Sequence, residues 1–201
     1  MRQLTAYQTF RLVIWMAIAS AIAFALMTSA RSPLLQWRDP IYQLASFAGI
    51  GALVLMIFQP LSAVGFVPGF SQRAGRRIHF FLGVAVVALV IVHVGALWVT
   101  SPPDVIDALL FVSPTQFSIW GVGAMWAIFG AALVTILRRS LSFRYRTWSR
   151  LHVALVSVAV AGTVVHIALI DGLIETVAKI AICVVVVGTL LVSLVRRRRR
   201  T

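Results

Sequence analysis

Six runs of mostly apolar residues divide this 201-residue chain, and each is long enough to cross a lipid bilayer as an α-helix. The runs lie at about 12–28, 42–58, 78–99, 117–137, 151–170 and 174–195. Hydrophobic residues make up 61% of the chain and charged residues 11%, whereas soluble domains average about 45–50% and about 25%. The sequence therefore predicts an all-α integral membrane protein, a six-transmembrane-helix bundle formed by a single domain over residues 1–201.

Residues that interrupt helices separate the apolar runs. These breakers are Ser32-Pro33, Pro60, Pro68-Gly69, Ser101-Pro102-Pro103 and Ser113-Pro114. The first two runs are the shortest, so their ends are the least sharply defined. The first run is also followed by the small residues Thr28-Ser29-Ala30, so a cleaved signal peptide is an alternative interpretation of it.

The arginines predict the orientation of the spans, because loops rich in Lys and Arg stay on the cytoplasmic side. They precede the first span and fill alternate connections, as Arg2, Arg11, Arg73, Arg76, Arg77, Arg138, Arg139, Arg144, Arg146, Arg150 and Arg196–Arg200. This alternation predicts that both termini are cytoplasmic. It also accounts for the net charge of +13 without nucleic-acid binding, and the terminal arginines are expected to contact anionic lipid headgroups.

The four histidines of the chain form two equally spaced pairs on the third and fifth predicted spans. His79 and His93 are fourteen residues apart, and so are His152 and His166. Fourteen residues of α-helix make nearly four turns and rise about 21 Å, so the two histidines of a pair share one helix face. Both spans are predicted to run outward, which places His79 and His152 near the cytoplasmic side and His93 and His166 near the outer side.

This placement favours two haems over other metal sites. Imidazoles about 21 Å apart on one helix cannot share one metal ion. A zinc site requires about four ligands, and Cys183 is the only cysteine. A haem needs only two axial ligands, which facing helices can supply, and bis-histidine ligation suits electron transfer. The sequence predicts an inner haem held by His79 and His152 and an outer haem held by His93 and His166. The alternative is that the histidines are interhelical hydrogen-bonding groups.

Glycines and arginines near the histidines are candidate cofactor-binding residues. Gly83 follows His79 by four residues and Gly162 precedes His166 by four, so each leaves room for a porphyrin, although small residues are also common where membrane helices pack. Arg76, Arg77, Arg146 and Arg150 flank His79 and His152 and can bind the carboxylates of the inner haem. They can equally attract an acidic donor protein or reflect topology alone. Lys179, four residues after Glu175, is expected either to form an ion pair with it or to bind an outer haem carboxylate.

Two segments resemble the ferric reductase-like transmembrane domain superfamily: RRIHFFLGVAVVALVIVHVGALW and RTWSRLHVALVSVAVAGTVVHIAL. This superfamily includes ferric reductases, the membrane part of NADPH oxidases and the haem-binding membrane subunit of the bacterial periplasmic methionine sulfoxide reductase system. Its members are six-helix bundles whose third and fifth helices supply the haem ligands. The resemblance implies that His79, His93, His152 and His166 ligate two haems b in a protein of the bacterial inner membrane. The similarity in span count and charge covers nearly the whole chain, while the specific motifs lie in these two helices.

The chain departs from the larger members of that superfamily. Ferric reductases and NADPH oxidases usually continue into a cytoplasmic module that binds FAD and NAD(P)H, and this sequence contains no such module. We therefore expect an electron-transfer component of an oxidoreductase, supplied by a cytoplasmic flavoprotein or a quinol. The methionine sulfoxide reductase subunit is similar in size and also lacks the module, so donation to a periplasmic methionine sulfoxide reductase is one alternative.

The leading hypothesis is a transmembrane cytochrome that passes electrons to an acceptor on the outer side, such as ferric iron, a quinone or a redox protein. A transporter with structural histidines is the alternative from another class of protein. Such a protein is expected to carry ionisable groups or broken helices near the midplane of the membrane, and the sequence shows no acidic residue there.

Overall fold

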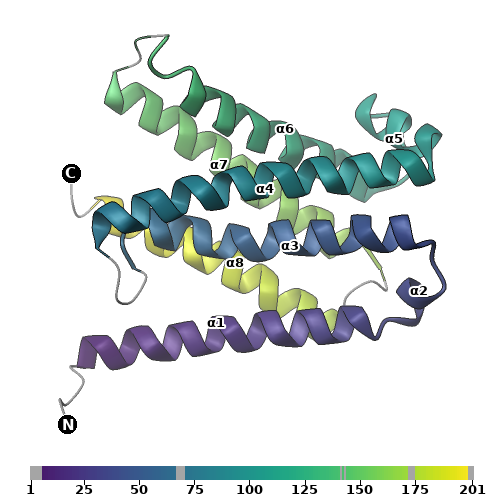
Figure 1. Cartoon of the computed structure of the whole chain (residues 1–201), viewed down its shortest axis with the longest axis horizontal. Helices are drawn as coiled ribbons and strands as arrows, with labels where there is room; N and C mark the ends of the chain where they lie inside the picture. Colours follow the sequence, from purple (N-terminus) through teal and green to yellow (C-terminus); the bar gives the residue numbers. More distant parts are fainter. Residues whose placement is uncertain (1–5, 67–70, 141, 143, 172–174, 199–201) are drawn as a thin grey trace. The chain divides into compact units, whose positions relative to one another are not determined.

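All regular structure in the described part of the chain is α-helical. The computed structural model describes residues 6–66, 71–140, 142, 144–171 and 175–198. The helices are α1 (Ala6–Ala30), α2 (Pro33–Gln36), α3 (Pro40–Ala63), α4 (Gln72–Thr100), α5 (Pro102–Leu109), α6 (Gln116–Ile136), α7 (Tyr145–Leu169) and α8 (Thr176–Arg198) (Figure 1). The predicted all-α class is therefore confirmed.

Each predicted apolar run coincides with one long helix. Five helices of the described chain are long and apolar enough to cross a membrane, namely α3, α4, α6, α7 and α8. Helix α1 has 25 residues, and Ile18–Ala30 is its apolar part in the described chain. The chain is thus an integral membrane protein with five predicted spans, and α1 occupies the place of the first predicted run.

The prediction that Pro60 ends the second run is wrong, because α3 continues through Pro60 to Ala63. Proline removes one backbone hydrogen bond and disturbs the preceding turn. Membrane helices tolerate this where side chains and neighbouring helices satisfy the backbone. In the same turn, Ser62 Oγ donates to the carbonyl oxygen of Gln59 at 2.8 Å.

Short helices occupy two of the predicted connections. Helices α2 and α5 both begin at proline, after Ser32 and Ser101. Proline is well suited to the first turn of a helix, because the N–H that it lacks has no partner there. Ser32-Pro33 and Ser101-Pro102 therefore separate long helices as predicted, and each also starts a short helix. The predicted breaker Pro68-Gly69 lies outside the described residues.

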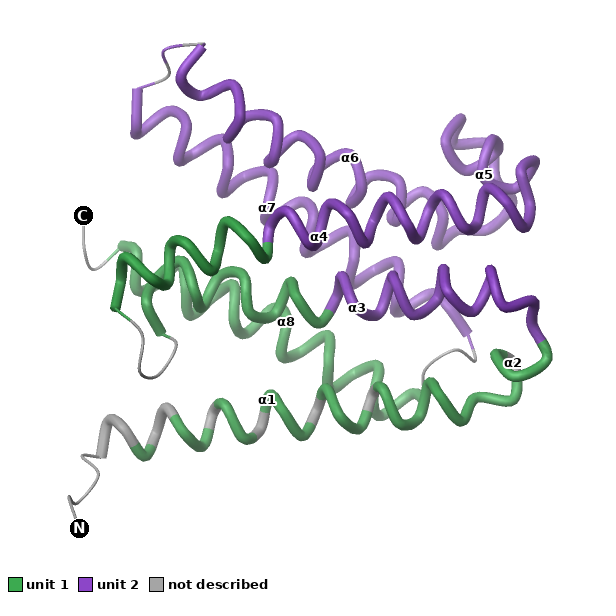
Figure 2. The backbone as a smooth tube through the Cα atoms, in the orientation of Figure 1, with its two compact units in different colours: residues 1–37, 54–82, 172–201 green, residues 38–53, 83–171 purple. Residues whose placement is uncertain are grey.

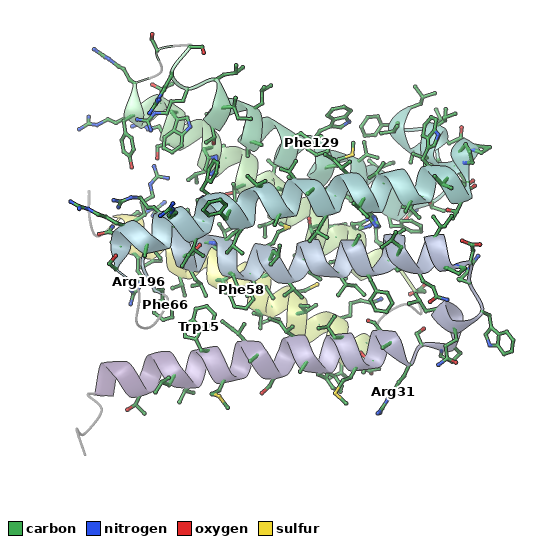
Figure 3. All side chains as sticks on the ribbon, viewed as in Figure 1. Trp15, Arg31, Phe58, Phe66, Phe129 and Arg196 are labelled. Atoms are coloured by element: carbon green, nitrogen blue, oxygen red, sulfur yellow. The ribbon has the colours of Figure 1, made fainter. Side chains whose placement is uncertain are left out.

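The chain divides into two compact units, which Figure 2 colours separately. The first comprises residues 1–37, 54–82 and 172–201, and the second comprises residues 38–53 and 83–171. In the first unit, the ring of Trp15 stacks on that of Phe58 with centroids 5.3 Å apart. The guanidinium of Arg196 lies 4.4 Å from the ring centroid of Phe66, and Figure 3 labels all four residues.

In the second unit, α6 and α7 form an antiparallel pair (Figure 1). The residues buried on α6 are mostly small and include Ala124, Ala127 and Ala131. Gly162 of α7 is also buried. A Cβ added at Gly162 would lie 3.0 Å from the carbonyl oxygen of Trp120 and 3.1 Å from Cβ of Ala124. The two helices therefore approach each other closely at small residues, as membrane helices commonly do.

The surface of the long helices is apolar, as a lipid environment requires. Large side chains that are more than half exposed include Met16, Phe80, Phe81, Ile91, Val158 and Val184. The buried polar residues of the described chain are five serines and Thr189. Hydroxyl groups can bond to the carbonyl of their own helix, so these side chains need no charged partner inside the protein.

Candidate functional site

The four histidines are the chemically distinctive side chains of the spans. Three of them, His93, His152 and His166, belong to the second unit, and His79 belongs to the first. His79 and His93 lie on α4, and His152 and His166 lie on α7. All four side chains are partly buried.

His93 bonds to the backbone of α3. Its Nδ1 atom lies 2.7 Å from the carbonyl oxygen of Ala45. The ring also packs against Gly49, where an added Cβ would lie 3.0 Å from Nδ1 and 3.1 Å from Cε1. Helix α3 therefore provides both the hydrogen-bond acceptor for this imidazole and the space for it.

His166 has the same environment on α6. Its Nδ1 atom lies 2.8 Å from the carbonyl oxygen of Phe117. A Cβ added at Gly121 would lie 2.7 Å from that Nδ1 atom. The ring of Phe117 meets the imidazole edge-to-face, with centroids 5.7 Å apart. An electrostatic interaction links His166 to His93, and both residues belong to the second unit.

His152 lies at the other level of α7, in a looser environment. Its Nδ1 atom is 3.3 Å from Thr135 Oγ1 and 3.4 Å from the carbonyl oxygen of Ala131. The indole of Trp148 stacks on its ring with centroids 5.6 Å apart, and the guanidinium of Arg138 lies 4.6 Å from the ring centroid of Trp148. Aromatic stacking thus orients this imidazole, in addition to its longer hydrogen bonds.

His79 is described within the first unit. Its Nδ1 atom lies 2.9 Å from the carbonyl oxygen of Gln59 on α3. The same carbonyl accepts the hydroxyl of Ser62 at 2.8 Å. His79 therefore also directs Nδ1 to the backbone of the preceding long helix.

These hydrogen bonds determine which ring nitrogen carries the proton. A carbonyl oxygen can only accept, so Nδ1 must donate, and in a neutral imidazole the lone pair is then on Nε2. Histidines that ligate metals almost always donate their other N–H in this way. Within the described chain, Nδ1 is the ring nitrogen of His93 and His166 that forms a hydrogen bond. Nε2 of both residues is therefore suited to bind iron.

The carbonyl acceptors repeat the spacing of the histidines. Ala45 and Gln59 are fourteen residues apart on α3, and Phe117 and Ala131 are fourteen apart on α6. The helix pairs α3–α4 and α6–α7 thus present their histidines in the same way, and a shift of 73 residues relates one pair of histidines to the other. The spacing of the histidines alone did not identify these acceptor residues, nor the glycines at positions 49 and 121, although the repeat of the acceptors is present in the sequence.

The other predicted site residues have varied environments. Gly162 lies against α6, at Trp120 and Ala124, and this contact explains the glycine through helix packing. Gly83 lies on α4, one turn after His79. The side chains of Arg76, Arg77, Arg146 and Arg150 are exposed. Glu175 accepts a hydrogen bond from the backbone N–H of Ala178 at 3.0 Å, so its carboxylate caps the start of α8.

The donor set of the described residues fits haem. Within them, no group of three or more His, Cys, Asp or Glu side chains could hold a metal ion. Haem iron needs only two axial imidazoles, each with a lone pair on one nitrogen and a bonded proton on the other. His93 and His166 have this arrangement and lie near each other.

The chain was also compared with known proteins. No protein-family model, no curated protein and no solved structure matches it.

Proposed function

We propose that this protein is a transmembrane b-type cytochrome of six spans, with α1 as the first and both termini in the cytoplasm. It would carry electrons from a donor on the cytoplasmic side, a flavoprotein or a quinol, to a redox acceptor on the outer side. Haem supplies one-electron chemistry when bound. The proposal rests on one observation above all: each histidine directs Nδ1 to a carbonyl of the preceding long helix.

The residues of the chain have separate tasks in this proposal. His93 and His166 would hold the outer haem iron through Nε2, and His79 and His152 would hold the inner one. The carbonyls of α3 and α6 hold each imidazole in one tautomer and one orientation. The apolar side chains of the spans exclude water, and Arg76, Arg77 and Arg150 are the candidate partners of the inner haem carboxylates.

Histidines that merely join helices would form the same Nδ1 bonds, so the haem itself must be tested. Protein purified in detergent should show the sharp bands of low-spin haem, and pyridine haemochrome analysis should give about two haems per chain. A variant with all four histidines replaced by alanine is the control and should be colourless. Wild-type protein that stays colourless with excess haemin would contradict the proposal and would favour a transporter with structural histidines.

A further inference from the structure

Two glycines lie against the imidazoles of the predicted outer level. Ala45 and Phe117 supply the carbonyls that accept from His93 and His166, and the residue four positions after each is Gly49 or Gly121. Residues four apart lie on the same face of a helix, one turn apart. The same acceptor-then-glycine pattern therefore occurs on α3 and on α6.

Helix geometry explains why the glycine comes four residues after the acceptor. A helical carbonyl points toward the residue four positions later, whose N–H it accepts. The imidazoles of His93 and His166 reach this oxygen and also lie against that later residue. A Cβ at Gly121 would lie 2.7 Å from Nδ1 of His166, and one at Gly49 would lie 3.0 Å from Nδ1 of His93. Both are shorter than normal contacts between carbon and nitrogen.

Other glycines of the second unit serve different purposes. A Cβ at Gly162 would meet the backbone and a side chain of α6, and the space around Gly95 and Gly123 is open to 4 Å. Only at Gly49 and Gly121 of these five is an imidazole the nearest group. Ordinary packing of small residues between helices therefore does not account for this pair.

We propose that Gly49 and Gly121 are positioning residues that let His93 and His166 reach their backbone acceptors and so set the orientation of the two imidazoles. In the cytochrome proposed above, on which the haem part of this inference rests, they would orient the ligands of the outer haem. The predicted inner level is built differently, because Ala63 follows Gln59 by four residues and Thr135 follows Ala131 by four. A change at either glycine should therefore affect one haem and spare the other.

The test compares Gly121→Ala and Gly49→Ala with matched controls on histidine-bearing and acceptor helices, Gly95→Ala and Gly123→Ala. With histidine labelled by 15N, the chain gives ring signals from only four residues, so haem-free protein in detergent can be studied by NMR. Gly121→Ala should shift the Nδ1 signal of His166, and Gly49→Ala should shift that of His93 by less. Both controls should leave the two signals in place.

Haem-loaded protein gives a second measurement. Gly121→Ala should change the low-spin EPR signal and midpoint potential of one haem, or lower the haem content from about two per chain to about one, while the other haem keeps wild-type values. Unchanged ring signals in both alanine variants would overturn the inference. If the wild-type protein binds no haem, the cytochrome proposal fails, and the NMR comparison still decides whether the glycines position the histidines. Gly49→Ala, with its milder contact, decides the matter if Gly121→Ala does not fold.

Discussion

Nδ1 of His93 lies 2.7 Å from the carbonyl oxygen of Ala45, a residue 48 positions earlier in the chain. This bond fixes the proton on Nδ1 and leaves the lone pair on Nε2. The relation of His166 to Phe117 is the same, at 2.8 Å over 49 positions. In the proposed cytochrome, these two Nε2 atoms would bind the same iron.

Histidines that serve one iron should not have additive effects. His93→Ala and His166→Ala should each lower the haem content from about two per chain to about one, and the double variant should keep about one. In contrast, His93→Ala combined with His152→Ala should remove both haems, because these residues are assigned to different irons. Pyridine haemochrome analysis measures each ratio. Loss of both haems in the His93/His166 double variant would show that the pairing is wrong.

Thr135 should strengthen binding of the haem that is assigned to His152. Its hydroxyl donates to the carbonyl of Ala131 at 2.8 Å and lies 3.3 Å from Nδ1 of His152. Thr135→Val removes this acceptor, and loss of such an outer contact typically lowers metal affinity about 10–100-fold. We expect faster transfer of one haem to apomyoglobin, with the other unchanged.

The control for Thr135 is Thr189→Val. Thr189 is buried on α8 and its hydroxyl donates to the carbonyl of Val186 in the same helix. This variant removes a hydroxyl of the same kind far from any histidine in sequence, so both haems should leave at the wild-type rate. Equal acceleration in the two variants would mean that Thr135 acts only through general stability.

Gly162 should contribute to stability rather than to cofactor binding. Gly162→Ala places a Cβ 3.0 Å from the carbonyl oxygen of Trp120, and overpacking of this kind costs about 1–3 kcal/mol. Thermal unfolding in detergent should therefore begin at a lower temperature than for Gly123→Ala, whose surroundings are open. If Gly162→Ala instead lowers the haem content at unchanged stability, the glycine leaves room for a porphyrin, as the sequence first suggested.

The orientation of the spans can be tested by labelling. Cys183 is first replaced by serine, and single cysteines are then placed at Leu110 and Thr147, both exposed residues outside or at the ends of the long helices. Positive-inside topology predicts that a membrane-impermeant maleimide added to intact cells labels Leu110→Cys and not Thr147→Cys. Lysed cells should label both, and the reverse pattern in intact cells would invert the assignment of inner and outer levels.

The sequence by itself determined the helices and the spacing of the histidines. Apolar length and helix period are local properties, so the runs at 78–99 and 151–170 predicted α4 and α7, and fourteen-residue spacing predicted one shared face. The prediction at Pro60 was wrong because the free-energy cost of a proline inside a helix depends on whether neighbouring groups satisfy the backbone. The sequence does not show those neighbours.

Only the tertiary structure decided what each histidine touches. The acceptors lie 20 to 49 residues away, and which carbonyl meets a ring depends on the register between antiparallel helices. Apolar lipid-facing helices pack through small residues and close contacts, and their hydrophobic pattern carries little information about that register. The same limitation applied to the glycines: the sequence suggested Gly162 from its distance to His166, whereas the structure places Gly121, 45 residues before His166, against the ring.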